Sequence, residues 1–178
     1  MKINVGSGIH KKEGYVNCDI AKDVGADHVF DAGSHRWPFE EDSVDEVLCE
    51  NLLEHLSAYE LDHFFEQAWR VLKDKGNLNL VVPHFMSYTA YYDPDHVRFF
   101  TPNSFIYWSR TCRGSDGRPV VRGDCDFDVK EVKQFVNKDM LEKYPELMLA
   151  EDCPAKHWWG VFEYIACCMV AVKPVRES

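Results

Sequence analysis

The chain has 178 residues, of which 46% are hydrophobic and 28% are charged, and its formal net charge at pH 7 is −10. This length fits one domain, and the composition is typical of a globular protein and excludes a disordered or fibrous one. The negative charge disfavours long-range attraction to polyphosphate, so it argues against a nucleic-acid partner.

The first residues, the longest apolar run and the cysteines of the sequence predict the cellular compartment of the protein. The first residues run directly into a strand-like segment without the apolar stretch of a signal peptide, and the longest apolar run, 164–172, is shorter than the ~20 residues needed to cross a bilayer. The seven cysteines are an odd number with no C-x-x-C pair, which is typical of reduced, buried thiols. We therefore expect a cytoplasmic protein with no membrane segment and seven free thiols.

The first half of the chain alternates strand-like and helix-like segments. Short apolar runs predict strands at 2–5, 15–20, 27–30, 44–49 and 78–82. Between the last two, Ser57 and Glu60 form a capping box that starts a helix with one apolar stripe as far as Leu72, and Gly76 is expected to stop it.

The second half adds an acceptor region and two longer strands. Thr101, followed by Pro102, predicts the start of another helix, which carries Phe105, Ile106 and Trp108. Runs at 127–136 and 161–172 predict strands, with a helical segment at 138–149 between them. Strands separated by crossovers predict a mostly parallel sheet with an antiparallel addition at its edge, which is a single-domain, doubly wound α/β fold.

Ligand-binding residues are expected directly after the strands, because open α/β sheets bind ligands at the carboxyl ends of their strands. The first strand is followed by Gly6-Ser7-Gly8, where glycines permit a tight turn and a close approach of backbone amides to a ligand. Asp19 follows the second strand and is placed to accept hydrogen bonds from the hydroxyls of a ribose. Asp31 follows the third and is placed to meet an adenine amino group. Taken singly, each aspartate is equally typical of a turn or a helix cap.

The sequence disfavours a dinucleotide-binding site and lacks a P-loop. The dinucleotide fingerprint G-x-G-x-x-G requires glycine where Lys11 stands, and its acidic residue belongs about 20 residues beyond the glycines, whereas Asp19 follows Gly8 by only eleven positions. No G-K-[ST] follows the glycines, so a P-loop is absent too.

The order of these motifs carries a resemblance. The segment INVGSG…GYVNCDI…VFDAGSHRWPFEEDSVDEVLCENLLEHL…FFEQAWRVLKDKGNLNLVVPH resembles the cofactor-binding half of class I methyltransferases that use S-adenosylmethionine (SAM). It is similar in particular to the methyltransferase type 11-like group with an EHL motif. The resemblance covers residues 2–84 and implies a seven-stranded sheet of order 3-2-1-4-5-7-6 with strand 7 antiparallel. The residues that it implies for SAM binding are Gly6, Ser7, Gly8, Asp19, Ile20, Asp31, Ala32, Glu50 and Asn51.

The sequence departs from this pattern at two points. The usual acidic residue before the glycines is replaced by Asn4, which still accepts hydrogen bonds but carries no charge. The connection from Gly8 to Tyr15 is too short for a full crossover helix, so we expect the first helix to be reduced to a turn. This leaves one wall of the SAM pocket thin, to be completed by other parts of the chain or by a second subunit in a homodimer.

The acceptor should meet the methyl group at residues 85–160 and at the ends of the fourth and fifth strands. An alcohol acceptor needs a base, because a neutral hydroxyl is a poor nucleophile. We expect His84 or His96 to take the proton, with Asp93 orienting the acting imidazole. Each also has a structural alternative, and two histidines with a carboxylate can instead hold a divalent metal, although we predict no metal site.

Further residues are expected to bind the acceptor. His55 belongs to the EHL pattern and lines either the cofactor or the acceptor, while Tyr92 and Arg98 lie in the aromatic segment AYYDPDHVRFF. Aromatic faces suit sugar rings, and this segment resembles family members that act on cell-surface or capsular glycans. Four arginines at 110–122 form either a solvated loop or an anchor for an anionic group.

The sequence therefore predicts a SAM-dependent methyltransferase that methylates an oxygen of a saccharide or another small hydroxylated acceptor. Methylation of RNA or protein is one alternative, which the acidic charge disfavours for RNA. A catalytically inactive subunit of the same fold is another, which retention of Gly6, Gly8, Asp19 and Asp31 disfavours.

Overall fold

A computed structural model describes residues 1–143 and 160–176. The strands are β1 (Lys2–Val5), β2 (Val16–Asp19), β3 (His28–Val29), β4 (Val44–Glu50), β5 (Leu72–Pro83), β6 (Phe127–Val136) and β7 (Phe162–Ala171). The helices are α1 (Ala58–Val71), α2 (Thr89–Tyr92) and α3 (Lys138–Lys143), with short 3₁₀ turns η1 (Leu53–His55) and η2 (Ser104–Trp108).

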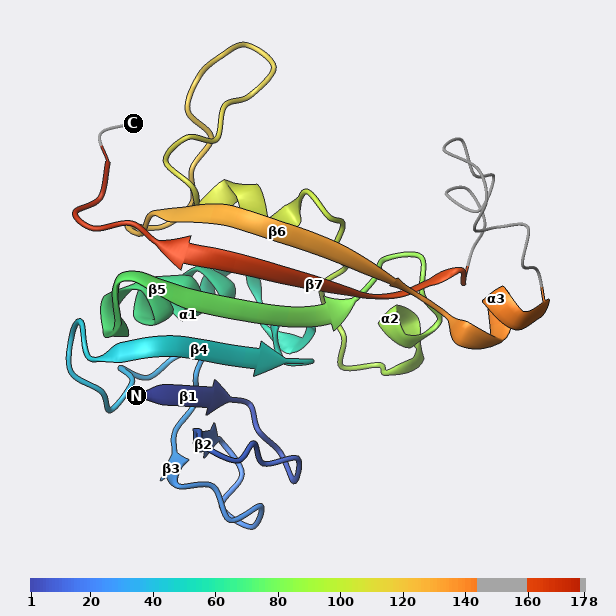
Figure 1. Cartoon of the computed structure of the whole chain (residues 1–178), viewed down its shortest axis with the longest axis horizontal. Helices are drawn as coiled ribbons and strands as arrows, with labels where there is room; N and C mark the ends of the chain where they lie inside the picture. Colours follow the sequence, from blue (N-terminus) through green and yellow to red (C-terminus); the bar gives the residue numbers. More distant parts are fainter. Residues whose placement is uncertain (144–159, 177–178) are drawn as a thin grey trace.

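The seven strands form one sheet of order β3-β2-β1-β4-β5-β7-β6 (Figure 1). The pairs from β3 to β5 are parallel, and β7 runs antiparallel between β5 and β6. This confirms the predicted α/β class, the strand order and the antiparallel strand 7. The order reverses direction between β1 and β4, where the carboxyl ends of two neighbouring strands diverge and leave room for a ligand.

The long helix α1 covers the sheet behind β4 and β5 (Figure 1). Ser57 and Glu60 form the predicted capping box at its start. The apolar stripe of α1, which includes Phe64 and Phe65, is fully buried, and the Phe65 ring stacks on Trp108 of η2 at 3.7 Å between ring centroids. The core therefore lies between α1, η2 and the rear face of the sheet.

Two helix boundaries differ from the prediction. The first helix ends at Val71, and Leu72 already pairs with Val44 of β4, so Gly76 does not stop it. Instead, the chain bulges before Asn77 rejoins the sheet, and a Cβ on Gly76 would lie 2.9 Å from Leu72 Cδ2. Glycine is thus required there for a close approach.

The helix predicted from Thr101 is only the 3₁₀ turn η2. The element begins at Ser104, and its N-cap Asn103 makes no side-chain capping hydrogen bond. The Ser104 hydroxyl accepts a hydrogen bond from the Thr101 backbone N–H at 2.9 Å, so Thr101 belongs to the turn that precedes η2. Of the three apolar residues expected on this helix, Phe105 and Trp108 are buried, whereas Ile106 is 39% exposed. The predicted helix at 138–149 is present as α3 to Lys143, and its remainder lies outside the described residues.

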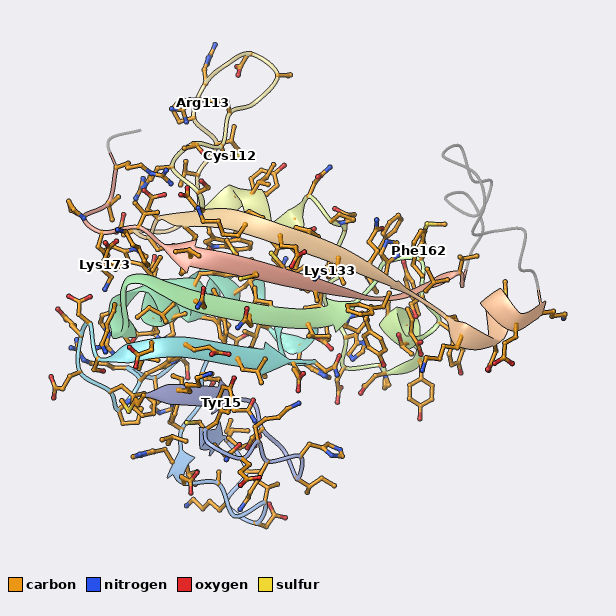
Figure 2. The ribbon with its side chains drawn as sticks, viewed as in Figure 1. Tyr15, Cys112, Arg113, Lys133, Phe162 and Lys173 are labelled. Atoms are coloured by element: carbon orange, nitrogen blue, oxygen red, sulfur yellow. The ribbon has the colours of Figure 1, made fainter. Side chains whose placement is uncertain are left out.

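The front face of the sheet is open. No helix in the described parts of the chain lies in front of the strands in Figure 1. The connection from Gly8 to Tyr15 contains only turns, as predicted, so no helix follows β1. Figure 2 shows the side chains that stand on the sheet, with Tyr15 and Lys133 labelled. Tyr15 donates a hydrogen bond to Glu46 at 2.5 Å, and Lys133 pairs with Glu131 at 2.9 Å.

The thiols and the helices bear on the expected compartment. The six cysteines in the described residues are free, and burial raises the pKa of Cys18 and of Cys167 to about 12. Cys153 lies outside the described residues. Within 1–143 and 160–176, no helix has both the length and the apolar character needed to cross a membrane.

Candidate functional site

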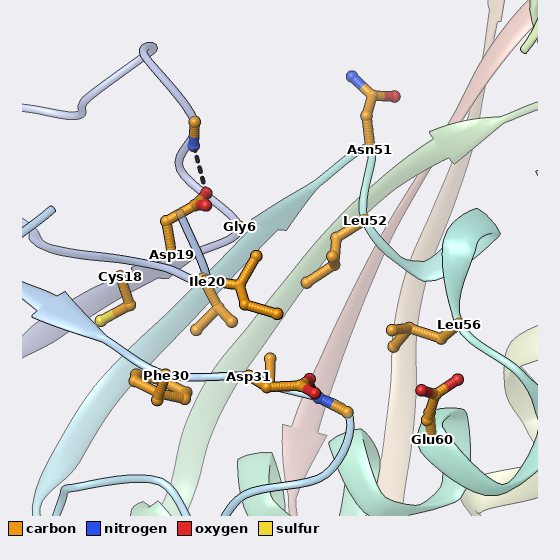
Figure 3. A pocket seen from close by; sticks show the side chains of 14 residues that line it. Gly6, Cys18, Asp19, Ile20, Phe30, Asp31, Asn51, Leu52, Leu56 and Glu60 are labelled. Carbon is orange, nitrogen blue, oxygen red and sulfur yellow. Dashed lines mark hydrogen bonds between the residues drawn. The ribbon is translucent and has the colours of Figure 1, made fainter. Parts of the chain in front are cut away.

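A pocket of about 360 Å³ opens at the carboxyl ends of β1 and β2 (Figure 3). It contains most of the residues predicted for the cofactor, and its polar groups come from the loops after successive strands, as the topology requires. The predicted residues that line it are Gly6, Gly8, Asp19, Ile20, Asp31, Ala32 and Asn51. Leu52, Leu56 and Glu60 complete the wall opposite them.

The glycine loop has a conformation that only glycine adopts easily. Gly6 and Gly8 have φ values of +74° and +49°. A Cβ on Gly6 would lie 3.0 Å from Leu52 Cδ2, whereas a Cβ on Gly8 would meet nothing within 4 Å. The backbone at Gly6 therefore lies directly against the pocket wall.

Asp19 holds this loop in place. Its two carboxylate oxygens accept hydrogen bonds from the backbone N–H of Gly8 at 2.7 Å and from that of Ala21 at 2.9 Å. A carboxylate has about four lone-pair positions, so each oxygen retains one for a ligand hydroxyl. Asp19 thus links the glycine loop to the floor of the pocket (Figure 3).

Asp31 caps its own turn. Its carboxylate accepts hydrogen bonds from Gly33 N at 2.8 Å and from Ser34 Oγ at 2.6 Å. The bond from Ser34 is the main reason why the pKa of Asp31 lies below its usual value. Asp31 is therefore anionic at neutral pH and keeps acceptor capacity on the pocket side, beside the buried Ala32.

A second hollow of about 540 Å³ continues from the pocket past Gly6, Gly8 and Asn51. The predicted Ser7 and Glu50 line it, together with Tyr164 of β7. Glu50 pairs with Lys12 at 2.8 Å, so the charge of this carboxylate is already balanced. The two hollows together run from the end of β3 to the end of β5, which is room for an elongated ligand.

His84 is not placed to act as a base. Its Nδ1 accepts a hydrogen bond from the Met86 backbone N–H, and its Nε2 donates to Gln134 Oε1, both at 3.1 Å. The side chain is buried between the rings of Phe85 and Phe162, and this burial lowers its pKa. With both ring nitrogens occupied, His84 fastens the end of β5 to β6, which does not support the predicted catalytic role.

His96 lies instead beside two residues of η1. Its ring meets that of His55 edge-on with centroids 4.6 Å apart, and its Nε2 lies 4.0 Å from Glu54 Oε1. Glu54 is 1% exposed, and neither of its carboxylate oxygens has a hydrogen-bond partner. This burial, augmented by the nearby charge of Asp93, raises the pKa of Glu54 to about 7. A buried carboxylate without a partner is costly, so its presence calls for a functional reason.

The other acceptor-side predictions fall in different places. Asp93 accepts a hydrogen bond from Asp95 N through its carboxylate, so it shapes a turn and does not orient His96, contrary to the prediction. Tyr92 is 70% exposed and packs on Tyr88. Arg98 donates from Nε to the Leu56 carbonyl at 2.9 Å and therefore anchors the end of η1.

The arginine loop is mainly structural. Arg122 binds the carboxylate of Asp62 on α1 through Nε and a terminal nitrogen, at 2.7 and 2.6 Å. Arg110 donates to the Gly123 carbonyl, and Arg113 donates to the Arg110 carbonyl. These contacts favour the loop interpretation over an anionic anchor.

Sequence reasoning missed several residues of the site. Among them are Leu52, which forms the wall against Gly6, and Glu54, which faces His96. The sequence signal for Glu54 was its position as a charged residue among the leucines Leu52, Leu53 and Leu56, which predict burial of this segment.

Comparison with known proteins agrees with this geometry. Residues 14–80 match the model of a family described as a methyltransferase domain. No curated protein sequence matches the chain.

Many solved structures share the fold. A SAM-dependent methyltransferase from Archaeoglobus fulgidus aligns with a TM-score of 0.63 and 14% identity over 95% of this chain and 85% of that one. One from Methanosarcina mazei aligns with a TM-score of 0.59 and 13% identity over 96% and 92%. Phosphoethanolamine N-methyltransferase 1 of Haemonchus contortus, solved with phosphoethanolamine and S-adenosylhomocysteine, aligns with a TM-score of 0.58 and 17% identity over 99% and 40%.

Proposed function

We propose that this chain methylates a hydroxyl of a small acceptor such as a saccharide. Its family match and its sheet order are those of a class I SAM-dependent methyltransferase. The single observation that carries the proposal is the position of the unpartnered Glu54 carboxylate, beside His55 and His96 and only two residues from the wall of the cofactor pocket. An acceptor with a weakly acidic proton needs such a group, because a neutral hydroxyl is a poor nucleophile.

We assign residues 2–84 to SAM binding and residues 85–160 to the acceptor within one domain. In this arrangement, Asp19 accepts the ribose hydroxyls, and Asp31 with Ala32 meets the adenine. The methionine part extends toward Glu50 and Asn51, into the second hollow. The continuity of the two hollows through Gly6 and Gly8 supports this direction.

The acceptor hydroxyl is activated at Glu54, His55 and His96 and not at His84. The turn η1, which contributes Glu54 and His55, lies between Leu52 and Leu56, and both of these leucines line the cofactor pocket. Methyl transfer from a sulfonium is an in-line displacement, so the main task of the protein is to align the acceptor oxygen with the methyl group.

The chemical nature of the acceptor is supported by the surface next to this cluster. Tyr88 and Tyr92 are 69% and 70% exposed, and the Tyr91 ring stacks on the half-exposed Phe99 at 4.5 Å between centroids. Exposed aromatic faces beside a polar cluster suit a sugar ring, which presents apolar faces and polar edges. This favours a role in glycan modification.

The open sheet face supports a homodimer, in which a second copy completes the thin wall of the second hollow. The acidic net charge disfavours an RNA acceptor, and the arginines that could have offset it are bound to neighbouring groups. The free, buried thiols suit a reducing compartment such as the cytoplasm.

The test is methyl transfer from SAM that carries a ¹³C-labelled methyl group to a panel of monosaccharides, nucleotide sugars, small amines and transfer RNA. The carbon chemical shift of the product distinguishes an O-methyl from an N-methyl group. We expect an O-methylated sugar, and the Asp19→Ala variant should lose this activity. Transfer to amines or RNA alone would contradict the proposed acceptor.

A further inference from the structure

Three metal-binding side chains converge at the end of β4. Glu54, His55 and His96 each offer one ligand-type atom, and these atoms all lie within 4.8 Å of one another. Two of the residues are adjacent in η1, and the third comes from the segment after α2, more than 40 positions later. Folding therefore brings the set together.

The tautomer of the neutral His96 ring follows from its neighbours. Its Nδ1 lies 3.1 Å from the carbonyl oxygen of Ala90, which can only accept a hydrogen bond, so Nδ1 carries a proton. In the neutral imidazole, Nε2 then presents a lone pair, and this lone pair faces Glu54 Oε1 at 4.0 Å. When Glu54 is ionised, two acceptor atoms thus face each other without a donor between them.

Glu54 has no other partner that could explain its burial. Both carboxylate oxygens lack a hydrogen bond, although the side chain is 1% exposed. Its backbone, in contrast, is firmly held, because its carbonyl accepts hydrogen bonds from the N–H groups of Val97 and Arg98. The same bonds fix the position of the segment that carries His96, so the cluster is preorganised.

We propose that Glu54, His55 and His96 bind a divalent transition-metal ion, with Zn²⁺ as the representative case. Two imidazoles and one carboxylate are a known ligand set for such ions, whereas Mg²⁺ prefers oxygen ligands alone. Ligands about 2.1 Å from a tetrahedral metal lie roughly 3.4 Å apart. The observed separations, 4.0 Å between Glu54 and His96 and at most 4.8 Å within the set, therefore require the side chains to move closer together on binding.

The surroundings of His96 match those of a metal ligand. A ligating histidine usually donates its second ring N–H to a backbone carbonyl or a carboxylate, and the bond from Nδ1 to Ala90 does this. His55 is exposed, which gives an ion an entry path. Three protein ligands would leave at least one position for a further ligand.

The role of the ion rests on the proposed function. A bound ion held by Glu54, His55 and His96 would offer its remaining position to the acceptor hydroxyl and would lower the pKa of that hydroxyl, so that its proton would pass to solvent water. In this arrangement, the three side chains would activate the hydroxyl through the ion, and Glu54 would act as a ligand and not as the base itself. Ion binding itself depends only on the three side chains.

The experiment is a calorimetric titration of the full chain with Zn²⁺ after dialysis against a chelator, repeated with Co²⁺ while the visible absorption of the ion is recorded. Glu54→Gln and His96→Ala are the test variants, and Glu54→Gln is nearly isosteric. His63→Ala is the matched control, because His63 lies on α1, outside the Glu54, His55 and His96 cluster, and its Nε2 lies 2.9 Å from the backbone oxygen of His35. Thermal unfolding verifies that each variant is folded, and SAM affinity is measured in parallel.

We expect one saturable site per chain and intense Co²⁺ bands typical of low coordination, both retained in His63→Ala. Glu54→Gln and His96→Ala should weaken binding by about 100-fold and abolish the bands, while SAM affinity changes little. Equal binding by all variants, or no saturable site in a protein that binds SAM, would overturn the metal site and leave the proposed function standing. Failure of the wild-type protein to bind SAM would instead refute the proposed function.

Discussion

The glycine loop offers the sharpest prediction, because three glycines with a positive φ differ in what surrounds them. Gly6 and Gly14 have φ values of +74° and +79°, and Gly8 has +49°. A Cβ on Gly6 would lie 3.0 Å from Leu52 Cδ2 and 3.1 Å from Leu52 Cβ, whereas a Cβ on Gly8 or Gly14 would meet nothing within 4 Å. Substitution by alanine therefore separates backbone strain from contact with the pocket wall.

The backbone cost is common to the three variants. An L-residue in the left-handed region costs about 1–2 kcal/mol, so Gly8→Ala and Gly14→Ala should each lose about that much free energy of unfolding. Gly6→Ala should lose more, since Leu52 must also move by a few tenths of an ångström. That movement changes the wall of the SAM pocket, and we expect a loss of at least tenfold in SAM affinity, which corresponds to about 1.4 kcal/mol.

The assay combines urea unfolding with calorimetric titration of SAM. Gly14→Ala is the control, because it lowers stability but lies outside the residues that line either hollow. If Gly6→Ala binds SAM as tightly as Gly14→Ala does, Leu52 is not part of the cofactor wall and the placement of SAM is wrong.

Three other measurements follow from the structure. Burial alone would raise the pKa of Asp126, but hydrogen bonds from Arg176 and from two backbone N–H groups hold this pKa below its usual value. The Asp126 carboxylate therefore stabilises the fold at pH values above its pKa in the unfolded chain. This stabilisation is lost as the pH falls through the lower pKa of the folded protein. Urea unfolding from pH 7 to pH 2.5 should therefore show a loss of stability at acid pH that Asp126→Asn reduces; an unchanged slope would contradict the ion pair. His84→Ala should lower the free energy of unfolding by about 1–3 kcal/mol, because it leaves the Met86 N–H and Gln134 without partners. The SAM affinity of this variant should stay within a few fold of the wild type. A normal unfolding curve together with turnover reduced by 10² or more would instead identify His84 as the base. All seven thiols should react with a thiol reagent in denaturant without reductant, and few of them in the native protein; two or more missing thiols would indicate a disulfide.

The strands and the α/β class could be predicted from local sequence patterns, whereas the strand order followed from the resemblance to class I methyltransferases. Apolar runs such as 44–49 mark strands wherever they occur, and the glycines after β1 mark the turn that the pocket needs. The boundaries that failed depend on tertiary contacts. Gly76 suggests a helix end, but the pairing of Leu72 with Val44 across the sheet ends α1 earlier.

The acceptor side was less predictable because the role of a polar residue depends on partners that are distant in the chain. His84 bonds to Gln134, which is 50 residues away, and no local pattern indicates this. Asp93 precedes His96 by three residues and was expected to orient it, whereas the Ala90 carbonyl does so. Glu54 emerged only when its burial and its lack of a partner were known.

Calorimetric titration with SAM and, separately, with NAD tests the central claim most directly, in the wild type and in Asp19→Ala. We predict one SAM site with an affinity on the micromolar scale, no detectable NAD binding, and a loss of about 10- to 150-fold in Asp19→Ala, because hydrogen bonds to a charged acceptor are worth about 1.5–3 kcal/mol. Tight binding of NAD, or an Asp19→Ala variant that remains folded and binds SAM as the wild type does, would contradict the account.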